Sequence, residues 1–187
     1  MALTCAMAQR TYTFNATALN VDGLPEKISF VTVNEGAPGA EGATLMGNAI
    51  AKQNWDIVGL SEDFNYHTEL TAPLANFYHV GTHRGGVSGL SNDTDGLGLL
   101  VAKRDGTGFS GESWTGWSTY NGYTDSGADG LIEKGFRYYA VTIASGIVID
   151  VYVLHMDADS NAGDIEARET QLAQLAAYIK GTSNKRP

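Results

Sequence analysis

The chain has 187 residues, of which 43% are hydrophobic, a length and composition typical of one globular domain with a sizeable core. Its formal net charge of −9 excludes a protein that holds nucleic acid through basic side chains alone, because such a protein is basic. An acidic chain still handles phosphates where bound divalent cations supply the positive charge. The single cysteine, Cys5, excludes an intrachain disulfide framework and a cysteine-rich metal site.

The first residues end in Ala6-Met7-Ala8, which matches the small-x-small pattern that precedes a signal-peptidase cut. We therefore expect residues 1–8 to be the remnant of an export signal and the protein to be secreted or periplasmic. An N-terminal extension without any address is the alternative.

The remaining chain alternates between strand and helix patterns. Apolar and β-branched residues predict strands over residues 11–21, 27–33, 55–60, 77–81, 97–103, 136–143 and 147–154. Apolar residues at helical spacing predict helices over residues 43–53, 68–76 and 163–180, and Gly- and Pro-rich residues 36–42 predict a loop. In the last helix we expect Gly181 as the C-cap and a buried face made of Ile165, Leu172, Leu175 and Ile179. Residues 106–130, rich in Gly, Ser and aromatic side chains, predict an irregular β-rich or looped excursion. This order of elements predicts a layered α/β domain.

Three predicted strands end on polar residues that are capable of chemistry. Asn20 follows ATAL, Glu62 follows DIVGLS, and His155 follows IDVYVL. Sites in α/β proteins gather where strands emerge from the sheet, and an Asn, a Glu and a His together suit a hard divalent cation and an anion. Taken singly, each has a plainer explanation: a solvated surface Glu, a structural His, and turn chemistry at Asn20.

Five segments carry a resemblance to a known family. They are ALNVDGLP (18–25), DIVGLSED (56–63), DGLGLLVAKR (95–104), EKGFRYYAVTI (133–143) and VYVLHMDADSNAGDIEARETQLAQLAAYI (151–179). In this order they resemble successive motifs of the endonuclease/exonuclease/phosphatase superfamily, which has the deoxyribonuclease-like fold. Lys-Gly-Phe at 134–136, His-x-x-Ala-Asp-Ser at 155–160 and Arg-x-x-Gln-Leu at 168–172 are most similar to the secreted branch that includes bacterial sphingomyelinases.

The resemblance implies a four-layered α/β/β/α sandwich, an α+β arrangement, of which residues 9–187 form the N-terminal two-thirds. The family carries an Asp-x-Asn after its helix and an Asp-His near its C-terminus, and neither has a counterpart here. We therefore expect the C-terminal part to be missing, and with it the general base, which would leave an inactive fragment.

The same resemblance assigns roles to the three strand-end residues. Glu62 would bind the catalytic Mg²⁺, or Mn²⁺ or another divalent cation in its place. Asn20 would support the metal site as a catalytic residue and further ligand, and His155 would face the scissile phosphate. Ser61 stands where the family usually has Gln, and Leu154 where it often has Thr.

The function implied is a magnesium-dependent phosphodiester hydrolase acting on a phospholipid head group in the manner of a sphingomyelinase. A nuclease of the same superfamily is the alternative within the enzymes. The alternative outside them is a non-catalytic glycan- or membrane-binding module that uses the aromatic residues Trp114, Trp117, Tyr120 and Tyr123. Packing of these rings within a long loop is the plainer explanation of the same residues. The partners expected are a phosphodiester substrate, lipid or nucleic acid, and a peripheral membrane contact, with no obligate protein partner.

Other polar residues receive plainer interpretations. Asp157 and Asp159 flank the expected site, and we expect loop solvation or a favourable charge near a helix N-terminus to explain them. Contact with the metal or the substrate is the alternative. His67, His79 and His83 show no metal-ligand spacing in the sequence.

Overall fold

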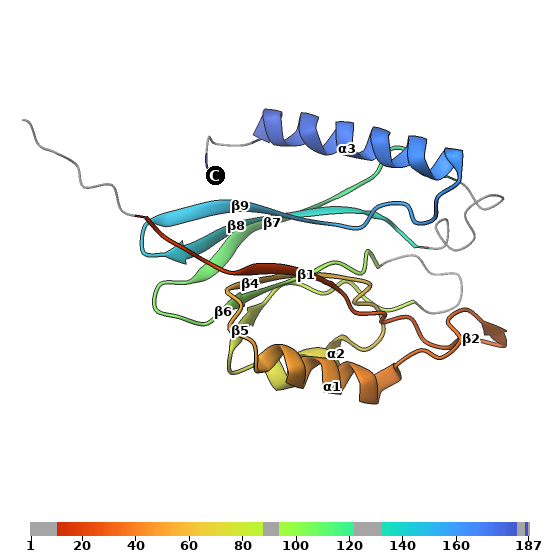
Figure 1. Ribbon diagram of the computed structural model, residues 1–187, viewed down its shortest axis with the longest axis horizontal. Helices are drawn as coiled ribbons and strands as arrows, with labels where there is room; N and C mark the ends of the chain where they lie inside the picture. Colours follow the sequence, from red (N-terminus) through yellow and green to blue (C-terminus); the bar gives the residue numbers. More distant parts are fainter. Residues whose placement is uncertain (1–10, 88–93, 122–131, 183–185, 187) are drawn as a thin grey trace, which may run out of the picture.

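The computed structural model describes residues 11–87, 94–121, 132–182 and 186. It has four layers: helices, a sheet, a second sheet facing the first, and a long helix on the outside (Figure 1). This arrangement confirms the expected α/β/β/α sandwich. The expected export-signal remnant, with Ala6-Met7-Ala8, lies outside the described residues.

The first sheet has the strand order β1-β4-β6-β5. Its strands are β1 (Ala16–Asn20), β4 (Ile57–Ser61), β5 (Tyr78–Val80) and β6 (Gly98–Ala102). β1 and β4 are parallel, and their register pairs Asn20 with Ser61. β6 runs antiparallel to both of its neighbours. Because β1 and β4 are parallel and in this register, the residues that follow them, Asn20 and Glu62 among them, emerge at one edge of the sheet.

The second sheet has the order β7-β8-β9 and is antiparallel throughout. Its strands are β7 (Gly108–Gly116), β8 (Gly135–Ala144) and β9 (Ile147–Leu154). Ser145 and Gly146 join β8 to β9, and Gly146 has a φ of 76°, a conformation that glycine adopts without steric cost. β9 ends at the same side of the molecule as β1 and β4 (Figure 1).

Helices α1 (Gly39–Ala51) and α2 (His67–Thr71), with the 3₁₀ turn η1 (Ala72–Leu74), cover the outer face of the first sheet (Figure 1). α1 buries Ala43, Gly47 and Ile50, which recur at helical spacing. A Cβ on Gly47 would lie 2.2 Å from the carbonyl oxygen of Leu70, so only glycine permits this approach of α1 to α2. α1 begins inside residues 36–42, which the sequence predicted as a loop, because its first turn needs no apolar side chain.

Two apolar cores hold the layers together. The first lies between α1, α2 and the first sheet and includes Ile50, Val58, Leu70 and Leu100. The second lies between the two sheets, with the fully buried residues Leu99, Tyr139 and Val141 at its centre. β4 and β6 contribute to both cores, which explains their continuous apolar sequences.

The long helix α3 (Ala162–Thr182) covers the outer face of the second sheet. The prediction that Ile165, Leu172 and Ile179 belong to its buried face is wrong, because these side chains are 47%, 52% and 36% exposed. The helix instead buries Asp164, Ala167 and Gln171. Asp164 accepts a hydrogen bond from the side chain of Asn121, and Gln171 accepts one from the N–H of Asp157, so the polar groups of α3 are satisfied by the loops that follow β7 and β9. The expected C-cap is also wrong, since the helix continues through Gly181 to Thr182.

The excursion predicted over residues 106–130 is more regular than expected in its first part. Residues 108–116 form β7, a strand of nine residues with one register shift, because Gly and Ser are tolerated where a strand pairs along its length with β8. Trp117 is buried against Phe136, with ring centroids 5.2 Å apart, so it belongs to the packing of the second sheet. Tyr123 lies outside the described residues. The described part of the predicted aromatic patch is therefore divided between core and surface.

A short hairpin of β2 (Lys27–Ile28) and β3 (Val31–Thr32) extends from the side at which β1 ends (Figure 1). Phe30 at its tip is 92% exposed and Val31 is 51% exposed. Within the described part of the chain, no helix has the length and apolar character needed to cross a membrane.

Candidate active site

The structure brings together the side chains of Asn20, Glu62 and His155. Asn20 Nδ2 donates a hydrogen bond of 2.7 Å to Glu62 Oε1. His155 Nε2 lies 3.6 Å from the same oxygen. Three strand ends, from both sheets, therefore meet at one carboxylate oxygen. The sequence predicted this proximity from the position of each residue after an apolar strand.

Asn20 is itself fixed on both sides of its amide. Its Oδ1 accepts a 2.9 Å hydrogen bond from the backbone N–H of Asp22, an Asx turn that bends the chain after β1. Asp22 Oδ1 in turn accepts from Asn34 Nδ2 at 2.6 Å. With its oxygen engaged by Asp22, Asn20 presents an N–H to Glu62 and thereby orients the carboxylate.

Glu62 has an uncommon backbone conformation. Its φ is 60°, in the left-handed region, which an L-residue with a Cβ adopts at a steric cost and which clusters at functional sites. Its carbonyl oxygen accepts hydrogen bonds from the N–H groups of Gly23 (2.8 Å) and Phe64 (3.0 Å). The side chain of Glu62 is 23% exposed, so the carboxylate is accessible at the mouth of the sheets.

His155 is held by the second sheet. Its N–H donates to the carbonyl of Gly135 at 3.0 Å, which extends the pairing of β8 and β9 by one residue. Its own carbonyl accepts a 2.7 Å hydrogen bond from Trp117 Nε1. Lys134, next to Gly135, is buried and donates to the carbonyl of Met156 at 3.1 Å. These contacts fix the backbone on both sides of His155.

Asp157 has a structural function that the sequence interpretation missed. It is 4% exposed rather than solvated, and it accepts from the N–H of Asn121 at 2.6 Å and from Gln171 Nε2 at 2.8 Å. Asp159 is exposed, as expected of a loop residue, and its φ is 59°. Asp157 thus joins the loop after His155 to α3, and its carboxylate faces amides rather than the site.

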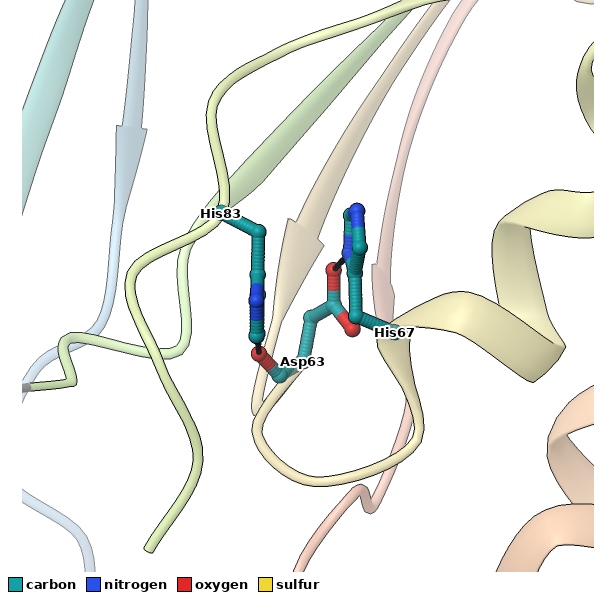
Figure 2. Close-up of side chains that lie close together, drawn as sticks. All are labelled: Asp63, His67 and His83. Carbon is teal, nitrogen blue, oxygen red and sulfur yellow. Dashed lines mark hydrogen bonds and ion pairs between the residues drawn. The ribbon is translucent and has the colours of Figure 1, made fainter.

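A second polar cluster lies beside Glu62, beneath the end of β4. The side chains of Asp63, His67 and His83 offer ligand-type atoms within 4.8 Å of one another (Figure 2). His67 Nδ1 is 2.6 Å from Asp63 Oδ2, and the imidazoles of His67 and His83 are stacked, with centroids 4.2 Å apart. Sequence spacing did not reveal this cluster, because its two histidines are 16 positions apart and the chain passes from the helical layer to the first sheet between them. The spacing of His67 four residues after Asp63 was the only local signal.

A buried ion-pair network joins the two sheets near the site. Asp95 is fully buried, and Arg137 approaches its Oδ2 with Nε at 3.0 Å and Nη2 at 2.9 Å. Burial acts to lower the pKa of Arg137, but the charge and hydrogen bond of Asp95 raise that pKa above its ordinary value. The guanidinium also bonds to Glu112 and to the carbonyl of Thr82. The network thus links β7 and β8 of the second sheet to Thr82 and Asp95, which follow β5 and precede β6 of the first.

The donor set around Glu62 fits a hard divalent cation. Glu62 supplies an accessible carboxylate, and its two contacts, an amide and an imidazole, carry no permanent positive charge. Mg²⁺ prefers one or two carboxylates and keeps several waters, so a single Glu is a sufficient protein anchor.

Comparison with solved structures identifies the fold. Sphingomyelinase C from Streptomyces griseocarneus superposes with a TM-score of 0.66 at 18% identity, over 91% of this chain and 60% of that one. A beta toxin mutant from Staphylococcus aureus, crystallised with bound magnesium ions, gives a TM-score of 0.65 at 16% identity, over 89% of this chain and 58% of that one. TDP2 from D. rerio, in complex with a single-strand DNA product, gives 0.61 at 17% identity, over 89% and 54%.

These neighbours are members of the endonuclease/exonuclease/phosphatase, or DNase I-like, superfamily, and the fold expected from the sequence motifs is confirmed. The chain spans less than two thirds of the length of each of them. No protein-family model and no curated protein sequence matches the chain.

Proposed function

We propose that the protein is a magnesium-dependent phosphodiester hydrolase and that Asn20, Glu62 and His155 form the metal and phosphate side of its active site. The observation that carries the proposal is the meeting of Asn20 Nδ2 and His155 Nε2 at Glu62 Oε1. The DNase I-like fold supports it, because the neighbours of this fold include a sphingomyelinase and a magnesium-bound toxin.

Each residue has a distinct role in the proposal. Glu62 anchors the cation through its carboxylate, and Asn20 keeps that carboxylate in place. His155, held rigidly by Gly135 and Trp117, donates a hydrogen bond from Nε2 to a phosphate oxygen and stabilises the charge that develops on it. A bound Mg²⁺ or Mn²⁺ would supply Lewis acidity and lower the pKa of a coordinated water.

A phospholipid head group is the substrate class that we favour. The net charge of −9 opposes a long polyanionic strand more than a zwitterionic head group, which carries no net charge. Phe30 and Val31 present apolar side chains to solvent from a hairpin on the side of the strand ends, where they would enter a lipid surface next to the site. The TDP2 complex with a DNA product makes a single-stranded nucleic acid the second candidate.

The test compares two substrates with one set of variants. The complete protein, with any residues encoded beyond Pro187, is incubated with Mg²⁺ and either sphingomyelin vesicles or a single-stranded oligonucleotide, with EDTA as the blank. We expect release of phosphocholine that Glu62→Gln and His155→Gln abolish, while Glu41→Gln, an exposed carboxylate of α1, leaves it unchanged. Hydrolysis of the oligonucleotide alone would establish the nuclease alternative.

The binding-module alternative has its own signature in the same experiment. Vesicles that bind the chain in sedimentation, with no hydrolysis in any Mg²⁺ or Mn²⁺ condition, would favour a non-catalytic module and contradict the enzymatic proposal. Phe30→Ser should then abolish sedimentation, since it removes the apolar tip without touching the site.

We also propose that the protein is exported, on the strength of Ala6-Met7-Ala8. Amino-terminal sequencing of the protein recovered from its natural source should find a chain that begins after Ala8. A chain recovered from the cytoplasm with its first eight residues intact would contradict this proposal.

A further inference from the structure

A histidine from another segment of the chain, outside the site, forms hydrogen bonds with the loop that carries Glu62. His83 lies beyond β5, and its Nε2 is 3.0 Å from the carbonyl oxygen of Asp63 and 2.9 Å from that of Phe64. Carbonyl oxygens only accept hydrogen bonds, so Nε2 carries the proton and donates to both. These are the two carbonyls that directly follow Glu62.

Several hydrogen bonds converge on the same turn. The N–H of Gly23 donates to Glu62, and the carbonyl of Gly23 accepts from the N–H of Asn65 at 3.0 Å. The N–H of Asp63 donates to the carbonyl of Gly96 at 2.9 Å. Residues 62–65 are therefore fixed by the loops that follow β1 and precede β6, with His83 closing the remaining side.

The ring of His83 is itself held in place. It stacks on His67 at a centroid distance of 4.2 Å and an interplanar angle of 10°, and His67 Nδ1 bonds to the buried carboxylate of Asp63 (Figure 2). Asn65 bonds through both ends of its amide to the backbone of Val87, at 3.0 Å each, and so binds the same segment to the loop. A histidine whose ring orientation is fixed in this way is a directional donor.

The parallel rings argue against one ion shared by the cluster. A metal bound to an imidazole lies in the plane of the ring, and two planes that stack almost in parallel do not meet at a common point near both nitrogens. The lone pair that His83 Nε2 would need is also replaced by a proton that two carbonyls accept. Chelation would require His83 to rotate and give up both hydrogen bonds.

We propose that His83 is a positioning residue for Glu62: its Nε2–H holds the carbonyls of Asp63 and Phe64, and with Asp63 and His67 it keeps Glu62 in the left-handed conformation that aims its carboxylate at Asn20 and His155. The positive φ of Glu62 is disfavoured intrinsically, so surrounding contacts must maintain it. The functional half of this inference rests on the proposed metal-binding role of Glu62, and the structural half does not.

Two substitutions separate the donor from the ring. His83→Gln keeps an N–H donor at the end of the side chain and loses the stack, whereas His83→Phe keeps the stack and loses the donor. His79→Phe is the matched control, because His79 lies in β5 and pairs with Val101 rather than with the Glu62 loop. Amide hydrogen exchange of Gly23 and Asn65, measured by NMR, reports on the loop without any metal.

In His83→Phe we expect the Gly23 and Asn65 amides to exchange about tenfold faster, the effect of losing roughly one net hydrogen bond. His83→Gln and His79→Phe should leave these rates near those of the parent, and amides of β8 should not change in any variant. Equal exchange in the Phe and Gln variants, whether fast or slow, would overturn the assignment of the Nε2–H donor.

Mn²⁺ titration then tests the functional half. His83→Phe should weaken Mn²⁺ binding severalfold while His83→Gln largely restores it. If Glu62→Gln does not affect Mn²⁺ binding, the proposed function fails, and the exchange rates still decide the role of His83. Stoichiometric Zn²⁺ binding that His67→Ala abolishes and Glu62→Gln retains would overturn the positioning role of His83 and would assign Asp63, His67 and His83 to a metal site.

Discussion

Asn20 and Glu62 are 42 positions apart in the sequence and are joined by a hydrogen bond of 2.7 Å between Nδ2 and Oε1. The bond crosses from the end of β1 to the residue after β4, two parallel neighbours in one sheet. The Asx turn to Asp22 fixes the side chain of Asn20, and Asn20 therefore holds the Glu62 carboxylate in a fixed position relative to the sheet. Such fixed orientation is what a single protein ligand needs to hold a cation in one place.

Replacement of Asn20 by Ala should weaken divalent-cation binding. It removes the donor to Glu62 and frees the carboxylate to rotate, and residues that hold a metal ligand by a hydrogen bond in this way are typically worth about 10–100-fold in metal affinity. Isothermal titration with Mn²⁺ measures the effect. Asn48→Ala, which removes an exposed amide from α1, is the control and should bind Mn²⁺ as the parent does. Equal affinity in the two variants would remove Asn20 from the site.

Gly23→Ala should disturb the Glu62 loop. A Cβ at Gly23 would lie 2.4 Å from the carbonyl oxygen of Glu62 and 2.8 Å from the nitrogen of Phe64, both backbone atoms that cannot rotate away. We expect a loss of about 1–3 kcal/mol in the free energy of unfolding, together with weaker Mn²⁺ binding. Urea unfolding measures the first effect.

Gly181→Ala is the control for this prediction. It makes the same substitution near the end of α3, where a Cβ meets nothing within 4 Å. It should leave stability unchanged or raise it by up to about 1 kcal/mol, because Ala is the better helix former. A Gly23→Ala variant as stable as Gly181→Ala would show that the loop is loose rather than tightly packed.

Arg137→Met should destabilise the domain by about 3–5 kcal/mol, because it leaves the buried Asp95 without its principal counter-charge. Arg84 is half-buried and lies 3.6 Å from Asp95, and this longer contact does not replace the two contacts of Arg137. Urea unfolding followed by circular dichroism measures the change. Arg104→Met breaks a more exposed pair with Asp56 and should cost less than about 1 kcal/mol. Similar losses in both variants would mean that the Asp95 pair contributes as little as a surface bridge.

Stability should fall steeply in alkaline solution, partly because of Tyr139. Burial of this phenol in the second core raises its pKa well above the usual value near 10. Above pH ~10 the unfolded chain therefore releases a proton that the folded chain retains, which favours unfolding by up to about 1.4 kcal/mol per pH unit. In Tyr139→Phe the free energy of unfolding should decline less between pH 9 and 11, as urea titrations at each pH would show.

Tyr120→Phe, at an exposed position, is the control for Tyr139→Phe. If the free energy of unfolding declines as much in Tyr139→Phe as in the parent, Tyr139 is not a source of the alkaline instability.

The sequence predicted the layers and the strand ends because both depend on local pattern. β4 reads as a continuous apolar run because it packs on both faces, and a polar residue at its end stands out. Asn20, Glu62 and His155 are far apart in the sequence. The parallel pairing of β1 with β4 brings the first two together, and the packing of one sheet on the other brings His155 to them.

Contacts between layers could not be predicted in the same way. α3 carries Ile165 and Leu172 at helical spacing, yet it packs through Asp164 and Gln171, because the loops after β7 and after His155 offer amide and carboxylate partners. His83 reaches the Glu62 loop from a segment with no regular structure. In both cases the deciding partner lies in a distant segment of the chain, and periodicity along one element carries no information about such a partner.

The measurement that tests the central claim most directly is a Mn²⁺ titration of isotope-labelled protein, followed through paramagnetic broadening of side-chain NMR signals. We expect substoichiometric Mn²⁺ to broaden the Asn20 side-chain amide and the His155 imidazole signals first, and Glu62→Gln to abolish this broadening. Broadening that persists in Glu62→Gln, or that centres on residues remote from Glu62, would contradict the assignment of these three residues to one metal and phosphate site.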